Sequence, residues 1–514
     1  MSRGKLATWN FSLTLAFSAI TIALGLISTP LLLRYLGAER LGTFRAACDL
    51  VGFLTLLDLG TGMALNAYFA SAVNNPDRSA VAQGVATGAR IYLRLAIPSV
   101  IFILSLVLFG PHILNTPPNL FVDLRLGILC VLLSIAVTWL NPLRQLADSR
   151  QQGYVIQFFN ILNQILIFVL SIFLAVAGMG IAGQFLAITI GGVFVAIVIA
   201  RREIIHDPTL WSALIGRTTC SAAVSKQIWR MNWASFTISA AGRLSLQADN
   251  LLIAMFLGPI PVVIFVASQR LLQLGATLAS TVGGSVWAGL AQIYHSGNHG
   301  LFCQRVLDAT RFTAILSLSA ILPAVVWTGS FVRLWIGSEY YAGDAVIVAA
   351  SVGIWLQAFL VIWGWVFSGL GMQAKLVPWS LAFVVVNVSL SCILTAKFGL
   401  IGPVLGTAIA HFILTSWWFP ILMRREFGIP LHKIVNAVGL PLLVAILYSP
   451  LLYGLSVTVP TDQLSRAGNL TVVVGLLSVG GIGYLAACWF AVLTSEHRQM
   501  FATRLRGFFG TAKA

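Results

Sequence analysis

The segment from Gln151 to Ala200 contains fifty residues without a single Asp, Glu, Lys or Arg. One α-helix of that length would extend about 75 Å at about 1.5 Å per residue, whereas the hydrocarbon core of a bilayer is only about 30 Å thick. The segment must therefore fold back on itself within the membrane, and Gly178-Met179-Gly180 is the obvious break. This stretch alone predicts two membrane-spanning helices.

Charge-poor runs of about 20 residues, the length that crosses a bilayer, recur along the chain. Hydrophobic residues make up 58% of the 514 residues and charged residues 9%, against about 25% charged in an ordinary soluble protein. We predict an all-α polytopic membrane protein with fourteen transmembrane helices. The predicted spans are 9–33, 41–69, 91–114, 126–146, 153–177, 180–200, 227–256, 262–287, 312–336, 345–370, 376–396, 399–423, 434–455 and 468–494.

The basic residues give the chain a formal net charge of +16. They are spread over short connectors rather than gathered in one patch, so we predict no nucleic-acid partner. If the N-terminus is cytoplasmic, 22 of the 31 Lys and Arg lie in inner connectors and seven lie in outer connectors or outer helix ends. The positive-inside rule therefore predicts that both termini are cytoplasmic.

The sequence indicates no cleaved signal, no disulfide, metal or cofactor site, and no catalytic machinery. The first apolar run, which ends at Leu33, is too long for the core of a cleaved signal, and we expect an uncleaved first span. The six cysteines are scattered without a CxxC pair or a His cluster, so no disulfide, metal site or cofactor is predicted. The outer connectors are too short to house a catalytic domain, and no nucleophile–base pair or Gly-rich phosphate loop is present.

Three local patterns recur at a spacing of about 220 residues and indicate an internal duplication. Leu36-Gly37 matches Leu257-Gly258, Gln152 matches Gln373, and GMGIAG from Gly178 matches FGLIG from Phe398. A six-span repeat begins and ends on one side of the membrane, so its copies would form a pseudo-twofold pair around a central cavity, as in alternating-access transporters. The two additional helices at the C-terminus fall outside this repeat.

The predicted domain organisation follows from the repeat. It comprises an N-terminal six-helix lobe at 1–200, a cytoplasmic linker at 201–226, a C-terminal six-helix lobe at 227–425, transmembrane helices 13 and 14 at 426–495, and a basic cytoplasmic tail at 496–514. The linker contains an amphipathic stretch around Trp211 that is expected to lie in the membrane interface.

The ordered motifs PLLLRYLGAERLGTFRAACDL with DLG at Asp58, ADNLLIAMFLGP, VASQRLLQL, LWIGSEYY, SGLGMQAK and KFGLIGPVLGTAI resemble the Wzx-type polysaccharide or O-antigen flippases. These belong to the multidrug/oligosaccharidyl-lipid/polysaccharide exporter superfamily, and the resemblance covers about residues 8–425. It implies a fourteen-helix, two-lobed transporter of the bacterial inner membrane. Such a protein moves an undecaprenyl-pyrophosphate-linked oligosaccharide from the inner to the outer leaflet during lipopolysaccharide or exopolysaccharide biosynthesis, with a polysaccharide polymerase and other assembly proteins as partners.

Three arginines inside predicted spans are candidate substrate-binding residues: Arg45, Arg243 and Arg270. The planar guanidinium binds phosphate oxygens through two hydrogen bonds and stays charged when partly desolvated. Arg45 lies four residues before Asp49, so an ion pair on one helix face is the favoured reading there. Arg270 has no acid in its own span, and substrate contact is favoured. Arg243 stays open between the two roles.

The buried acids and amides offer further candidates. Asp249, Asp58 and Asp49 are candidates for coupling transport to an ion gradient, although Asp58 is equally explained by a hydrogen bond between helices. Five amides supply polar surface that either binds sugar hydroxyls or joins helices: Gln247, Asn250, Gln269, Gln273 and Asn66. Trp287, Trp363 and Trp365 are candidates for stacking on sugars, with core packing favoured.

The sequence thus favours a lipid-linked oligosaccharide flippase. A cation-coupled multidrug exporter of the same superfamily is the first alternative, and a lipid II flippase is the second. A cavity for cationic drugs should favour acids, whereas Arg243 and Arg270 here offset Asp249 and Asp58, which favours an anionic substrate.

Overall fold

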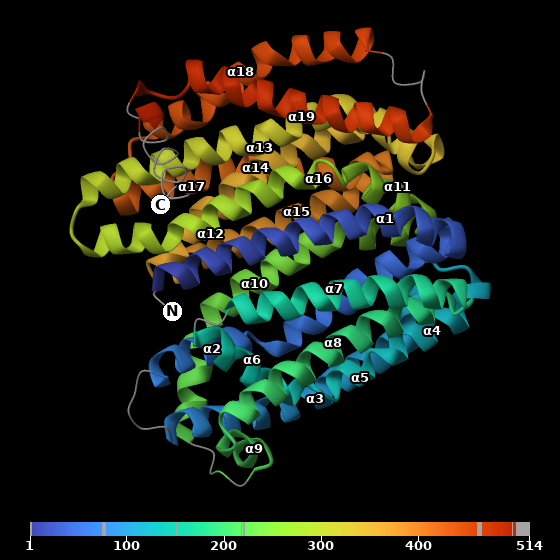
Figure 1. Ribbon diagram of the computed structural model, residues 1–514, viewed down its shortest axis with the longest axis vertical. Coiled ribbons are helices and arrows are strands. Elements are labelled where there is room, and N and C mark those ends of the chain that lie inside the picture. Colours follow the sequence, from blue (N-terminus) through green and yellow to red (C-terminus); the bar gives the residue numbers. More distant parts are fainter. Residues whose placement is uncertain are drawn as a thin grey trace, which may run out of the picture. The chain divides into compact units, whose positions relative to one another are not determined.

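The structure, a computed structural model, describes residues 3–73, 79–150, 153–216, 218, 222–459, 465–495 and 497–499. All regular structure in these ranges is helical, as Figure 1 shows. This confirms the predicted all-α class. The chain divides into two compact units, Met1–Val263 and Ile264–Ala514. The predicted boundaries at 200, 226 and 425, and the predicted two-lobe layout, remain predictions.

The first unit is built from the helices before Val263. They are α1 (Arg3–Gly52), α2 (Thr61–Ala72), α3 (Ser79–Ile113), α4 (Phe121–Cys130), α5 (Leu132–Ile135), α6 (Asn141–Ser149), α7 (Gly153–Val176), α8 (Gly180–His206), α9 (Thr209–Leu214) and α10 (Ala222–Leu257), with short 3₁₀ turns at Phe53–Asp58, Pro118–Leu120 and Thr138–Leu140. Helix α11 (Pro259–Gln269) carries the boundary between the units.

The second unit contains the remaining helices. They are α12 (Gln273–His295), α13 (His299–Trp335), α14 (Asp344–Gly369), α15 (Val377–Phe398), α16 (Ile401–Ala410), α17 (Ser416–Phe427), α18 (Leu431–Thr458) and α19 (Arg466–Ala491). A π-helical turn, His411–Thr415, joins α16 to α17, and 3₁₀ turns lie at Ser338–Tyr340 and Gln373–Leu376.

Eleven helices of the described residues are long and apolar enough to cross a membrane, or twelve if the bent pair α11–α12 counts as one span. One of the eleven, Ala16–Asp58, contains the break at Gly37, where the sequence predicts a turn between two spans. Helix α10, which carries polar as well as apolar residues, is not among them. The count of fourteen therefore stays a prediction.

Two of the repeated sequence patterns have a glycine with positive φ at corresponding positions. Gly37, at the break inside α1, and Gly258, directly after α10, have φ of 80° and 86°. Gly178 and Gly399, which follow α7 and α15, have φ of 78° and 67°. Positive φ of this kind is readily adopted by glycine, so the sequence correctly located the turns, including the fold-back between α7 and α8. The third pair rests on Gln152, which lies outside the described residues.

Three predicted spans are broken where the sequence suggested continuous helices. The predicted span 41–69 is interrupted after Gly52 by a 3₁₀ turn and by left-handed residues at Leu59 and Gly60. The span 126–146 divides into α4, α5 and α6. The span 262–287 bends by 57° between α11 and α12, next to Arg270. Apolar composition predicts burial in lipid but does not reveal where a helix bends.

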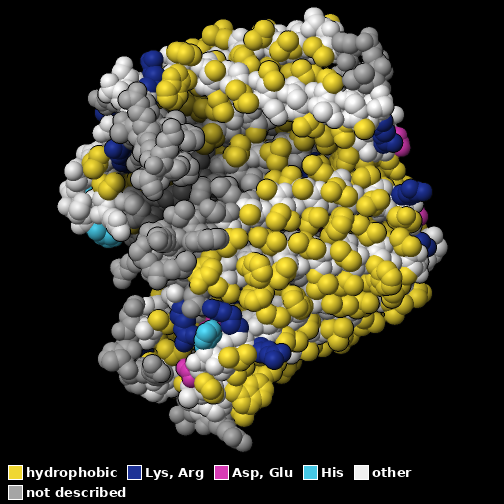
Figure 2. All heavy atoms as spheres, viewed as in Figure 1, with side chains coloured by type: hydrophobic (Ala, Val, Ile, Leu, Met, Phe, Trp, Pro, Cys, Tyr) yellow, Lys and Arg dark blue, Asp and Glu magenta, His cyan; other side chains and the backbone are white. Residues whose placement is uncertain are grey.

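The outward surface of the helices is apolar, as expected for contact with acyl chains. Figure 2 shows hydrophobic side chains over much of the visible face, with Lys and Arg along its right edge and in a group at its lower left. On α18 and α19, Leu447 is 71% exposed and Phe490 is 73% exposed. In the core of the second unit, stacked aromatic rings join Phe359, Trp363 and Phe419.

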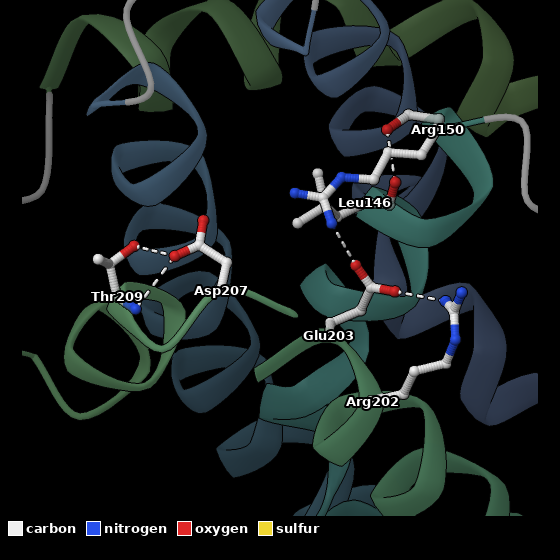
Figure 3. Close-up of polar contacts among 7 residues, drawn as sticks. Leu146, Arg150, Arg202, Glu203, Asp207 and Thr209 are labelled. Carbon is white, nitrogen blue, oxygen red and sulfur yellow. Dashed lines mark hydrogen bonds and ion pairs between the residues drawn. The ribbon is translucent and has the colours of Figure 1, made fainter. Parts of the chain in front are cut away.

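A buried carboxylate joins the ends of two helices in the first unit (Figure 3). Glu203, near the end of α8, is fully buried and forms ion pairs with Arg150 at 2.6 Å and with Arg202 at 2.8 Å. Four residues on, the Asp207 carboxylate accepts a hydrogen bond from the Thr209 backbone N–H at 3.1 Å and so caps α9. Helix α9 packs on α3 and leaves Trp211 48% exposed.

We predict that Glu203→Gln lowers the free energy of unfolding by about 2 kcal/mol, because two guanidinium groups lose their shared counter-charge at a buried position. Thermal unfolding of the detergent-solubilised protein, followed by circular dichroism, measures the loss. The matched control is Glu39→Gln on α1, since Glu39 makes no ion pair within the described ranges. Equal melting temperatures of the two variants would show that the Glu203 ion pairs do not stabilise the fold.

Candidate functional site

Four polar side chains form a cluster where α1 packs on α10, which we call the α1–α10 polar cluster: Asp49, Gln247, Asp249 and Asn250. The Asn250 amide Nδ2 donates a hydrogen bond to Asp49 Oδ2 at 2.6 Å. Gln247 lies against Gly52, where an added Cβ would approach its Nε2 to 2.4 Å. The Asp49 carboxylate also interacts electrostatically with Asp249. Glycine at position 52 thus makes room for the amide side chain.

The cluster holds more buried acceptor oxygens than it has donors. Gln247 Oε1, Asp249 Oδ1 and Asn250 Oδ1 are buried and have no hydrogen-bond partner in the described part of the chain. A buried polar atom left unsatisfied costs about 1–3 kcal/mol. Oxygen ligands of this kind suit a hard cation, and a proton on one carboxylate would also relieve the repulsion between the two acids. These chemistries make the cluster the candidate ion site.

The donor atoms of the cluster are oxygens and amide nitrogens. No group of three or more His, Cys, Asp or Glu among the described residues could hold a metal ion. Its ligands are two carboxylates and two carboxamides, which favour a proton or a hard cation over a soft metal.

The predicted ion pair between Arg45 and Asp49 is wrong. No salt bridge within 4.0 Å joins these side chains in the described residues, and the Asp49 carboxylate instead accepts the hydrogen bond from Asn250. Helical spacing places Arg45 and Asp49 on one face. It cannot reveal a competing donor on another helix, 201 residues further along the chain. Arg45 is half-buried and still influences Asp49 electrostatically.

Asp58 lies at the break between α1 and α2, outside the α1–α10 polar cluster. Its Oδ2 accepts a hydrogen bond from the Gly62 backbone N–H at 3.2 Å, in the first turn of α2. Tyr92 on α3 is within hydrogen-bonding reach of the same carboxylate. These contacts favour the structural explanation for Asp58, since it caps one helix and faces another.

The remaining candidate residues are distributed over both units. Arg243 is exposed on α10 in the first unit. Arg270 is half-buried in the second unit, in the bend between α11 and α12. Gln269, beside it, has a buried Nε2 without a hydrogen-bond partner in the described ranges. Gln273 is exposed at the first residue of α12, and Asn66 is half-buried on α2.

Two residues near these groups were not singled out from the sequence. Ser245 Oγ on α10 is buried without a hydrogen-bond partner in the described chain, one helical turn before Asp249. This i, i+4 spacing was visible in the sequence and could have identified it. Tyr92, which faces Asp58, gave no comparable signal because it is 34 residues away and its proximity depends on the packing of α3.

No protein-family model matches the chain. Over 511 residues it is 22% identical to the uncharacterized membrane protein EpsK of Bacillus subtilis (strain 168), covering 97% of this chain and 98% of that protein.

Two solved structures resemble this chain over most of its length. The lipid II flippase MurJ, in an inward closed conformation, matches 92% of this chain and 98% of its own with a TM-score of 0.67 at 15% identity. An inward-facing multidrug resistance MATE family transporter of the MOP superfamily matches 79% of this chain and 96% of its own, with a TM-score of 0.61 at 17% identity.

The chain therefore shares the fold of these two solved proteins, a lipid II flippase and a MATE family transporter. The expectation of a transporter-like, all-helical membrane fold is confirmed at this level. At 15–17% identity the likeness defines the fold and leaves the transported substrate open.

Two substitutions compare the structural acid Asp58 with Asn66, a half-buried amide on α2. Asp58→Ala should lower the free energy of unfolding by about 1–2 kcal/mol, because α2 loses its capping acceptor. Asn66→Ala on the same helix should change it by no more than about 0.5 kcal/mol. Melting temperatures of the purified variants test this, and an unchanged melting temperature for Asp58→Ala would remove its structural role.

Proposed function

We propose that the protein is a Wzx-type flippase that moves an undecaprenyl-pyrophosphate-linked oligosaccharide from the inner to the outer leaflet by alternating access. The observation that carries the proposal is the fold shared with a lipid II flippase over 92% of the chain. The motifs quoted above, spread over about residues 8–425, support the polysaccharide branch of the superfamily. The likeness to flippases and transporters favours transport without chemical conversion of the substrate.

Several finer statements belong to the same proposal. The chain has fourteen transmembrane helices in two six-helix lobes plus a C-terminal pair, and it resides in the bacterial inner membrane with both termini cytoplasmic. Its partners are the lipid-linked substrate, membrane lipids and a polysaccharide polymerase with other assembly proteins. The basic inner connectors and the apolar helices support this placement.

The substrate requires a path for a pyrophosphate across about 30 Å of hydrocarbon. Arg270 is suited to one step of that path, because it lies at a bend where the helix is interrupted and its guanidinium can offer two donors to phosphate. Neighbouring Gln269 and Gln273 provide amide groups for sugar hydroxyls or phosphate oxygens. Arg243 and Arg45 are further cationic positions in the first unit.

Arg270→Ala should lower the rate of headgroup translocation about tenfold or more, because a charge-assisted pair of hydrogen bonds to the pyrophosphate is lost. Proteoliposomes loaded with undecaprenyl-pyrophosphate-linked oligosaccharide report translocation as headgroup accessibility to an external hydrolase. Arg40→Ala, at an exposed arginine on α1, is the matched control and should transport at the wild-type rate.

Full activity of Arg270→Ala would exclude Arg270 from the substrate path. Absence of protein-dependent translocation in the wild type, across several candidate lipids, would refute the flippase function itself.

A cation-coupled multidrug exporter is the second candidate, and the observation that favours it is the fold shared with a multidrug resistance MATE family transporter. The α1–α10 polar cluster offers two carboxylates to a coupling ion. Ion coupling through Asp49 and Asp249 is compatible with either substrate. A drug-resistance assay in a sensitive host separates the two functions, since a flippase for anionic lipids should confer no resistance to cationic amphiphiles.

The ion site itself is tested with Asp249→Asn. An imposed proton or sodium gradient should accelerate transport by this variant about tenfold less than transport by the wild type. The reason is that a neutral amide, unlike a carboxylate, can neither bind and release a proton nor neutralise a bound cation. Asp344→Asn, at an exposed acid on α14, is the control and should retain the full response to the gradient. An undiminished response in Asp249→Asn would place coupling elsewhere.

A further inference from the structure

Two tryptophans of the second unit form an exposed stacked pair. The rings of Trp287 on α12 and Trp365 on α14 are 6.1 Å apart between centroids, with an interplanar angle of 27°. Trp287 is 38% exposed and Trp365 is 40% exposed. Trp327 and Trp363 in the same unit are only 1% and 3% exposed. The pair therefore presents aromatic surface that core packing does not use.

Glycines on the opposite helices hold each ring in place. A Cβ added at Gly283 of α12 would lie 2.6 Å from Cδ1 of Trp365. A Cβ added at Gly369 of α14 would lie 3.1 Å from Cε3 of Trp287. The Trp365 indole thus rests against Gly283, where a Cβ would clash with it, and the Trp287 indole packs closely on Gly369. Packing of this kind restricts the rings, and a restricted aromatic surface loses less conformational entropy when it binds.

The helix face around Trp287 is polar or small rather than aliphatic. Positions 273, 277, 280, 284 and 287 repeat at helical spacing and share one face of α12. Gln273, Ser280 and Gly284 on this face are exposed, and Thr277 is half-buried. A lipid-facing helix looks different, as the exposed Ile446, Leu447 and Leu451 of α18 illustrate. Polar intramembrane faces typically line a water-filled cavity or a protein interior.

The chemistry of this face matches a saccharide. Sugar rings have an apolar C–H face and a rim of hydroxyl groups, and an indole offers a broad apolar face together with one N–H donor. Gln273 adds both donor and acceptor groups. From Gln273 to Trp287 the helix rises about 21 Å at about 1.5 Å per residue, so the face extends from the bend beside Arg270 to the tryptophan pair. In the substrate the phosphate precedes the sugar rings, and the same order along α12 would place the phosphate beside Arg270 and the sugar rings toward the tryptophan pair.

We propose that Trp287 and Trp365 form a carbohydrate-binding platform and that the exposed face of α12, from Gln273 to Trp287, accommodates the saccharide of a phosphate-linked lipid. This proposal rests on the proposed flippase function, since it assigns the sugar portion of the same substrate. The ligand class is a short oligosaccharide attached through pyrophosphate.

The test compares two lipids on the full-length protein in nanodiscs. One probe is undecaprenyl pyrophosphate, and the other is the same lipid carrying a chitobiose disaccharide. The wild type should bind the glycosylated lipid more tightly. Trp287→Ala and Trp365→Ala should each weaken that binding about tenfold and leave binding of the bare lipid unchanged, whereas Trp287→Phe should retain most of the affinity. Trp417→Ala, at a 62% exposed tryptophan on α17, is the control and should bind both lipids normally.

Two outcomes would overturn the platform while leaving the flippase intact. The first is equal weakening of both lipids, which would make the pair an anchor for lipid rather than a sugar site. The second is equal affinity of the wild type for both lipids. If neither lipid binds, the flippase function fails for these two lipids, and free chitotetraose then tests the platform alone. If the wild type binds chitotetraose and Trp365→Ala does not, the platform is supported. If the wild type does not bind chitotetraose, the platform is refuted together with the flippase function for these lipids.

Discussion

A backbone amide without a hydrogen-bond partner costs several kcal/mol in hydrocarbon, and this cost governs the whole fold. It explains why the regular structure in the described ranges is entirely helical. It also makes every helix break a place where polar side chains are needed. At the start of α8, both oxygens of Asp123 accept backbone N–H groups, from Ile181 at 2.8 Å and from Ala182 at 2.9 Å. At the start of α2, the Asp58 carboxylate likewise accepts a hydrogen bond from the backbone N–H of Gly62.

The same cost separates structural charges from candidate functional ones. Glu203 is fully buried but has two arginine partners, and Asp308 on α13 binds the His497 ring Nε2 at 2.9 Å. Such paired groups join helices. Asp249 and Asp58 each keep a buried oxygen without a hydrogen-bond partner in the described chain, but only Asp249 lies beside a second carboxylate, that of Asp49. Two neighbouring acids that the fold retains at an energetic cost are candidates for an exchangeable ion.

The candidate site was only partly predictable. Asp49, Gln247, Asp249 and Asn250 were all singled out because polar residues are rare in apolar spans. Their grouping was not, since helical spacing relates only residues of one helix and here favoured Arg45 as the partner of Asp49. The contact between Asp49 and Asn250 joins positions 201 residues apart and depends on how α1 packs on α10. The stacking of Trp287 on Trp365 likewise depends on the glycines of two different helices.

The sequence by itself determined that the chain is helical, that it lies in a membrane, and where several turns must fall. Fifty uncharged residues cannot cross a bilayer as one helix, so the turn at Gly178–Gly180 followed from length alone. Only the tertiary structure decided where helices bend, as at Leu59-Gly60 and beside Arg270, and which polar groups meet. Hydropathy is a local property of consecutive residues, whereas bends and polar contacts depend on packing between segments that are distant in the chain.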